Sequence, residues 1–388
     1  MKYKKDSPIP VIYYHSVALK KNTKWQFGFL TLGLKYFEDQ LKYFVRNKYR
    51  SIFLDEYYAN RKGDVLLDDK TICLTFDDGY LDNWVYVFPL LKKYNLKATI
   101  FVNPDFVDKK NKLRNNLEDY WNGKKTINEI NKWGFLSWGE MKLMEDSGLI
   151  DIQAHTMTHT KYFISDKLNG FHHPGSRRIY PLWNSFPSIK PYYIQNKDFE
   201  RILPYGYPLF EEASAIVARR VFINNDFNDE VIEACKKMEW KNYNFKNTLK
   251  RIKPIYEEYY KKNKLIIKRE SEQEYLHRLN YEIVISKQII EEKLKRKINF
   301  CSWPNGDNNK LAHKIAIECG YMATTIGNLE EVSKDYERID GRIGTSQVRN
   351  SRILTLMKAI YKIKSYQQIN PYYTIKKIYY KKKYGKKI

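Results

Sequence analysis

Two short segments combine carboxylates and imidazoles at spacings that suit hydrolytic chemistry. An apolar run ends at residues 75–79 in two adjacent carboxylates, Asp77 and Asp78, and a glycine. A second apolar run leads into His155 and His159, which are four residues apart. One carboxylate and two imidazoles form a facial set of metal ligands that leaves positions for water or substrate. The second carboxylate is then free to act as a base on that water, so the two segments together predict metal-assisted hydrolysis.

Each segment alone is a weak signal. An Asp-Asp-Gly triplet is often a surface turn, and two histidines four apart can be solvated or core residues. Neighbouring side chains of a regular strand face opposite ways, so Asp77 and Asp78 reach one pocket only if the strand ends there, which Gly79 permits. Sites of barrel enzymes lie at the carboxyl ends of strands, and both segments follow strand-like runs. The joint occurrence is therefore a strong signal.

The elements around these segments alternate between strands and helices, which is typical of a parallel sheet or barrel. Residues 71–76 are continuously apolar, as a strand buried on both faces would be. Ser137 and Glu140 form a capping box for a helix that ends near Gly148. Further strands are expected at 10–14, 97–102, 149–152, 298–301 and 321–325, and further helices at 37–44, 82–93, 283–294 and 310–319.

The alternation is interrupted between residues 161 and 280, where prolines and aromatic residues are frequent. Charged helical stretches are expected at 211–221 and 229–240. The segment is interpreted as an insertion on the site's face, serving as a lid or substrate platform, with a purely structural subdomain as the alternative. The expected organisation is a barrel from 1–160 and 281–350, an insertion at 161–280, and a basic, partly amphipathic tail at 351–388.

Composition bounds the class of protein. The 388 residues are 43% hydrophobic, enough for a substantial core, and no stretch has the apolar length of a membrane span. Four widely spaced cysteines indicate free thiols in a reducing compartment. The N-terminus is a poor signal peptide, so we expect a cytoplasmic chain, peripheral at the inner face of the membrane if it is attached there.

The net charge of +24 has two open interpretations, compositional drift and an anionic partner. Residues 352–387 hold eleven Lys or Arg and no Asp or Glu, which favours a partner. An anionic membrane surface is preferred to nucleic acid, for which no motif is apparent.

At this point the motifs resemble those of the polysaccharide deacetylase family, also called carbohydrate esterase family 4 or the NodB-homology fold. Segments 75–79 and 155–159 match its first two motifs, and 300–306 and 320–327 are similar to later ones. Tyr14 and His15 resemble the start of the branch that deacetylates poly-N-acetylglucosamine. The resemblance covers about 8–160 and 282–345, and implies an α/β fold with a distorted (β/α)7-type barrel.

The resemblance also implies roles for residues. Asp78, His155 and His159 would bind one divalent metal, with zinc expected although cobalt, nickel or iron would also suit. Asp77 would be the base. The family's arginine that orients the base is not visible in the third motif; Arg338 or Arg342 could substitute for it, with pairing to surface acids as the alternative. The remaining roles would be protonation of the leaving amine by His15, stabilisation of the oxyanion by the backbone N–H of Asn305, and contact with substrate by Trp303, Pro304 and Tyr80. Trp303 is a core residue in the alternative interpretation.

The leading hypothesis is removal of N-acetyl groups from a GlcNAc-type amino sugar in a surface polysaccharide or its precursor. A carbohydrate O-acetyl esterase shares the same motifs and stays open. A non-catalytic glycan-binding protein belongs to another class, and it would have no need of both aspartates and both histidines.

Overall fold

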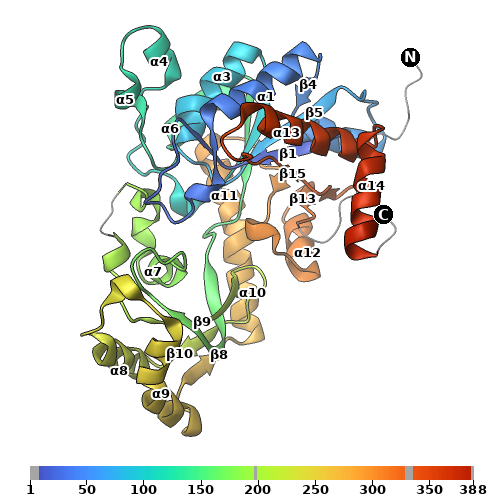
Figure 1. Ribbon diagram of the computed structural model, residues 1–388. Coiled ribbons are helices and arrows are strands. Elements are labelled where there is room, and N and C mark those ends of the chain that lie inside the picture. The colour runs from blue at the N-terminus through green and yellow to red at the C-terminus, as the bar shows by residue number, and fades with distance from the viewer. Residues whose placement is uncertain (1–7, 196–198, 328–334, 386–388) are drawn as a thin grey trace.

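A sheet of nine parallel strands forms the centre of the computed structural model, which describes residues 8–195, 199–327 and 335–385. The strands are β1 (Val11–Tyr14), β4 (Arg50–Ile52), β5 (Thr71–Phe76), β6 (Ala98–Val102), β7 (Ile150–Ala154), β12 (Phe300–Cys301), β13 (Ala323–Thr325), β14 (Arg338–Ile339) and β15 (Ile343–Gly344). Their order is β14-β13-β12-β7-β6-β5-β1-β15, with β4 paired to the start of β5. Within the described residues this path has two ends, so the sheet is an open curl with helices around it (Figure 1). The predicted distorted α/β barrel is confirmed.

Strand β5 shows how the sequence builds this sheet. All six of its residues are buried, as its continuous apolar run predicts. Ile72, Leu74 and Phe76 belong to the large core cluster between strands and helices. Cys73 points the other way, into a smaller cluster with Val11 of β1 and other strand residues. The alternation along β5 therefore packs both faces of the sheet.

Helices cover the outer face of the curled sheet, and most lie where the sequence predicts. The capping box of Ser137 and Glu140 starts α6, and Gly148 lies just beyond its end with φ of +72°. The predicted helices at 82–93 and 283–294 both begin with a π-helical turn, which widens the helix by one residue per turn. The helices of this layer are α1 (Leu34–Arg46), α2 (Leu54–Lys62), η2 (Asn83–Val87), α3 (Phe88–Tyr94), α4 (Leu117–Trp121), α5 (Ile127–Ile130), α6 (Trp138–Asp146), α10 (Glu272–Asn280), η7 (Tyr281–Ile285), α11 (Ser286–Leu294) and α12 (Lys310–Glu318).

The insertion extends away from the barrel and has a core of its own (Figure 1). An antiparallel ribbon of β8 (Lys161–Phe171) and β9 (Pro208–Ser214) forms its base, and Phe171 and Phe210 pack in its core. Its other elements are α7 (Tyr180–Ser185), η4 (Pro187–Tyr192), η5 (Phe199–Arg201), β10 (Val221–Ile223), α8 (Asn225–Cys235), η6 (Trp240–Asn242), α9 (Phe245–Lys261) and β11 (Ile266–Arg269).

The helix predicted at 211–221 is wrong. Residues up to Ser214 belong to β9, a turn follows, and β10 begins at Val221. The helix-forming residues of this stretch pair with β8 because that pairing buries Leu209 and Phe210, so tertiary packing overrides local propensity. The helix predicted at 229–240 is present as α8, displaced toward its Asn224 cap.

The C-terminal segment forms two helices, α13 (Arg352–Tyr366) and α14 (Tyr372–Tyr384). Helix α13 packs against α1, and its Ile363 and Tyr366 belong to the main core. Helix α14 instead exposes Ile375, Ile378 and Tyr379 (51%, 62% and 52% exposed). No helix in the described part of the chain is both long enough and apolar enough to cross a membrane.

Candidate active site

Both predicted ligand segments lie at the carboxyl edge of the sheet. Asp77 and Asp78 directly follow β5, and His155 directly follows β7, with β6 between these strands. Asp78 and Gly79 both have positive φ, at 73° and 63°, which turns the chain sharply after the strand. A Cβ on Gly79 would meet Val102 Cγ1 at 2.9 Å, so the turn requires glycine there.

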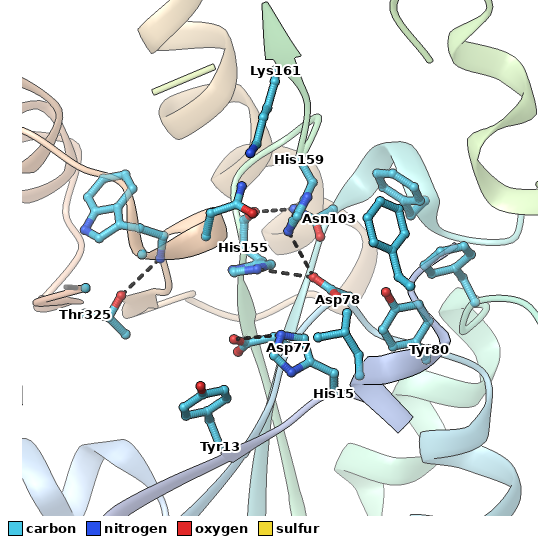
Figure 2. Close-up of a pocket in the computed structure, with 18 of the residues that line it drawn as sticks. Tyr13, His15, Asp77, Asp78, Tyr80, Asn103, His155, His159, Lys161 and Thr325 are labelled. Carbon is cyan, nitrogen blue, oxygen red and sulfur yellow. Dashed lines mark hydrogen bonds and ion pairs between the residues drawn. The ribbon is translucent and has the colours of Figure 1, made fainter. Parts of the chain in front are cut away.

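Asp78, His155 and His159 converge as a candidate metal set (Figure 2). Asp78 Oδ1 lies 3.3 Å from His155 Nε2 and 3.2 Å from His159 Nε2. His155 Nδ1 lies 2.8 Å from the Ser302 carbonyl, to which it donates, so Nε2 is the nitrogen that faces Asp78. Asp78 Oδ1 is buried and accepts no hydrogen bond from the described residues. A carboxylate oxygen and imidazole lone pairs that face one another fit a divalent cation between them.

Arg342 is the arginine that orients the predicted base. Its Nη1 and Nη2 donate to Asp77 Oδ1 and Oδ2, each at 2.7 Å, and Nη2 also donates to Ser302 Oγ at 2.9 Å. Arg338 instead contacts Asn308 and Thr324. Burial raises the pKa of Asp77, but the charge and hydrogen bonds of Arg342, together with the nearby His155 and His15, outweigh it and hold that pKa below its usual value. Asp77 is therefore ionised and fixed in orientation.

His15 lies on the same side as Asp77 and lines the same cavity. Its Nε2 is 3.9 Å from Asp77 Oδ2. Burial lowers the pKa of His15, although the charges of Asp78 and Asp77 raise it in part. The imidazole is thus neutral in the resting site and within reach of the base.

Residues 303–305, in the segment that resembles a later family motif, differ in how far they reach the cavity. Trp303 is fully buried in the main core, which favours the core role over sugar stacking. Pro304 is buried and is not one of the residues that line the cavity, so its contact with substrate stays a prediction that this geometry does not support. Asn305 lines the cavity in a left-handed conformation with φ of 58°, and Tyr80 lines it as a buried phenol. The oxyanion role of the Asn305 N–H stays a prediction.

The cavity has a volume of about 500 Å³ and a wall rich in aromatic rings. The insertion supplies part of this wall through Tyr180, Trp183 and Tyr193, together with Lys161. The insertion's paired histidines, His172 and His173, do not line this cavity. The other Phe, Tyr and Trp side chains of the wall are Tyr13, Phe27, Phe29, Tyr80, Phe106, Phe135 and Trp303.

Residues that the sequence analysis did not single out hold the metal-ligand loop, which is the segment 155–159 that carries the candidate ligands His155 and His159. Thr156 and His159 have positive φ of 62° and 45°, conformations that cost energy in residues other than glycine. Glu282 accepts hydrogen bonds from the N–H groups of Met157 (3.1 Å) and Thr158 (3.0 Å) and from the Thr158 hydroxyl. Glu282 is fully buried, and burial raises its pKa. Its place at the start of a predicted helix was no signal for this role.

Two further side chains hold the same loop. Asn103, which follows β6, donates to the carbonyls of His155 and Thr156. Lys190 of the insertion donates to the Thr158 carbonyl at 3.0 Å. The loop is thus held by the barrel and by the insertion together.

An open parallel barrel with a carboxylate, two imidazoles and an arginine-held second carboxylate at its carboxyl edge defines a hydrolase-type site. Comparison with known proteins agrees: the polysaccharide deacetylase family model matches residues 65–173, which include both ligand segments. The resemblance of the motifs to the polysaccharide deacetylase family is thereby confirmed over this part of the chain.

Relatives of known name are distant. The chain is 33% identical over 102 residues to the Bacillus subtilis (strain 168) protein named Putative polysaccharide deacetylase YxkH, covering 26% of this chain and 34% of that protein. The fold is similar to a de-N-acetylase from Aggregatibacter actinomycetemcomitans, with a TM-score of 0.54 and 18% identity over 90% of this chain and 99% of that one. It is also similar to the BpsB deacetylase domain of Bordetella bronchiseptica, with a TM-score of 0.51 and 17% identity over 89% and 97%. These structures confirm the NodB-type fold.

Proposed function

We propose that the protein is a metal-dependent hydrolase that removes N-acetyl groups from a GlcNAc-type amino sugar in a surface polysaccharide or its precursor. The observation that carries this proposal is the Arg342–Asp77 pair beside Asp78, His155 and His159 in one cavity. A base fixed by two hydrogen bonds next to a set of metal ligands is an arrangement for deprotonating a water molecule. The family name and the two deacetylases of similar fold support the acetyl group as the acyl group that is transferred to water.

Asp78, His155 and His159 would hold the metal, which supplies a Lewis acid that makes a bound water nucleophilic near neutral pH. Asp77 takes the proton of the attacking water at a carboxylate oxygen, while Arg342 keeps that carboxylate in place. His15 is neutral at rest, so it must gain a proton before it can protonate the departing amine. The group that carries that proton after the attack is Asp77, whose Oδ2 lies 3.9 Å from His15 Nε2. The Asn305 N–H would stabilise the oxyanion.

The experiment that tests this proposal measures bound metal and acetate release together. Purified protein is expected to hold about one zinc or cobalt ion per chain, and His155→Ala is expected to lose it. Acetate release from N-acetylated and O-acetylated saccharides then separates the amidase from the O-acetyl esterase. Metal binding without acetate release from either set would favour a glycan-binding protein, and absence of metal in both proteins would reject the site.

We also propose that α14 attaches the protein to an anionic membrane surface. Three features support it: Ile375, Ile378 and Tyr379 are exposed at helical spacing, the exposed lysines 377, 381, 382 and 383 lie on the same helix, and no acidic residue occurs between 352 and 388. An amphipathic basic helix of this kind lies in the headgroup region of anionic bilayers.

Co-sedimentation with vesicles of phosphatidylcholine and phosphatidylglycerol tests the attachment. Because α13 belongs to the core, the test uses substitutions rather than removal of the C-terminal segment. Ile375→Ser with Ile378→Ser is expected to weaken binding about 100-fold or more, since two apolar side chains worth about 1.5–3 kcal/mol each leave the bilayer. The matched control is Ile267→Ser, an exposed isoleucine of the insertion (63% exposed), which should bind as the wild type does. Equal binding of all three proteins would reject the role of α14.

A further inference from the structure

The charges that line the cavity are unequally compensated. Its two permanently cationic side chains are Arg342 and Lys161. Arg342 is neutralised by Asp77 through two hydrogen bonds. Of the other lining carboxylates, Asp340 pairs with Arg61 at 2.6 Å, and Asp78 belongs to the metal set. Lys161 is therefore the lining cation whose charge is left without a compensating carboxylate among the described residues.

The position of Lys161 makes this charge useful. It is the first residue of β8 and is half-buried, and its Nζ lies 5.3 Å from the centre of the Tyr180 ring. Figure 2 shows its amine directed toward the side of the cavity where His155 and His159 lie. It lies two positions after His159 in the sequence, a separation of about 7 Å between Cα atoms in an extended chain. An anion on Lys161 would thus lie within about one sugar ring of the metal set.

Lys190, another lysine near the cavity, differs from Lys161 because its amine is fully paired within the protein. Its Nζ, 2.8 Å from Asp105 Oδ2, is paired and hydrogen-bonded. Lys161 has an aromatic ring on one side and the cavity on the other, and in the described part of the chain its amine forms no ion pair. Holding an uncompensated ammonium in a half-buried site costs free energy, which an anionic ligand would offset.

We propose that Lys161 binds an anionic substituent of the substrate. This inference rests on the proposed function and specifies its substrate class: an N-acetylated amino sugar that carries a phosphate or carboxylate group beside the acetamide to be hydrolysed. The three N–H donors of the lysine suit either anion. The aromatic wall takes the faces of the sugar, and Lys161 selects the charged sugar over a neutral one.

The test compares acetate release from N-acetylglucosamine 1-phosphate, from N-acetylmuramic acid, and from the neutral methyl glycoside of N-acetylglucosamine. We expect kcat/KM to favour an anionic sugar in the wild type, and Lys161→Gln to reduce this preference about tenfold or more, the value of a charge-assisted hydrogen bond. Lys161→Arg keeps the charge and should retain most of the preference. The phosphate and carboxylate arms identify which anion the site takes.

The matched control is Lys167→Gln, a lysine of the same strand that is 72% exposed and does not line the cavity. It should leave all three rates unchanged. Equal losses on charged and neutral sugars in Lys161→Gln, with an unchanged ratio, would overturn the inference. If no sugar releases acetate, the proposed function fails, and equilibrium binding of the same sugars to the Asp77→Asn protein with and without Lys161→Gln still decides whether Lys161 selects anions.

Discussion

Lys190 ties the insertion to the metal-ligand loop by donating from Nζ to the carbonyl of Thr158 at 3.0 Å. The same nitrogen lies 2.8 Å from Asp105 Oδ2, and the lysine side chain is only 2% exposed. Thr158 directly precedes the candidate metal ligand His159, so a side chain of the insertion contacts the backbone next to that residue. The insertion therefore supports the metal-ligand loop directly and also forms part of the cavity wall.

Replacing Lys190 should weaken both the fold and the metal site. Lys190→Met leaves the Asp105 carboxylate and the Thr158 carbonyl without their cation, and the loss of one partner of a buried pair costs about 3 kcal/mol. Urea unfolding measures this cost, and a chelator competition titration with zinc measures the accompanying loss of affinity. Lys142→Met, which breaks the exposed Lys142–Asp146 pair, should cost less than about 1 kcal/mol and leave zinc affinity unchanged.

Arg342 should control the base. In Arg342→Gln we expect kcat to fall about 100-fold, within the range that general-base catalysis contributes. Removing the guanidinium also raises the pKa of Asp77, so the acidic limb of the pH–rate profile should move to higher pH. Arg338→Gln is the matched control, because Arg338 contacts Asn308 and Thr324 rather than Asp77. Equal effects of the two substitutions would show that Arg342 has no specific role.

Glu282 should act as a positioning residue for the ligand loop. Glu282→Ala removes the acceptors of two backbone N–H groups and of the Thr158 hydroxyl, and zinc affinity should fall about 10- to 100-fold, as when outer-shell partners of metal ligands are lost. Glu282→Gln keeps one carbonyl oxygen and should fall between Ala and the wild type. A loss of unfolding free energy with zinc affinity unchanged in both variants would make the role purely structural.

Asp82 should make stability depend on pH. Burial raises its pKa to about 7, although hydrogen bonds from Ser16 Oγ and Asn83 Nδ2 partly counteract the rise. The folded protein then holds this proton where the unfolded chain has lost it, so stability is highest at low pH and falls as pH rises toward 7. From pH 5 to pH 8 the contribution lost is about 3 kcal/mol.

Asp82→Asn, which keeps the size and an acceptor oxygen, should remove this part of the pH dependence. Urea unfolding of both proteins at pH 5, 6, 7 and 8 measures the difference between them. Parallel curves for the two proteins would show that Asp82 does not titrate in this range.

The parts of the fold that local patterns encode were predictable. The buried strand 71–76 has the predicted bounds, and the Ser137–Glu140 capping box starts a helix at the predicted place. Both signals are carried by residues adjacent in sequence. The convergence of Asp78, His155 and His159 was predictable for the same reason, since these three candidate ligands lie in two short motifs.

What depends on contacts distant in sequence was not predictable. Arg338 and Arg342 are four residues apart, and no local sequence pattern distinguishes one from the other. Only the pairing of β15 with β1 brings Arg342 beside Asp77. The strand β9 was mistaken for a helix because its partner β8 decides its conformation. Lys190 carries no motif at all, and its role arises from the fold of the insertion over the loop.

The ends of the insertion meet at one point: it leaves the barrel after Thr158 and His159, and the chain returns at Glu282, which hydrogen-bonds to Thr158. An insertion whose two ends lie together can change its length with little increase in the entropic cost of closing it, so the sheet is little affected. The insertion, which forms part of the cavity wall, can thus be replaced as a unit during evolution while the carboxyl edge of the sheet is retained. The same junction is a suitable place for protein engineers to graft another insertion. Any replacement insertion would have to supply its own counterpart of Lys190.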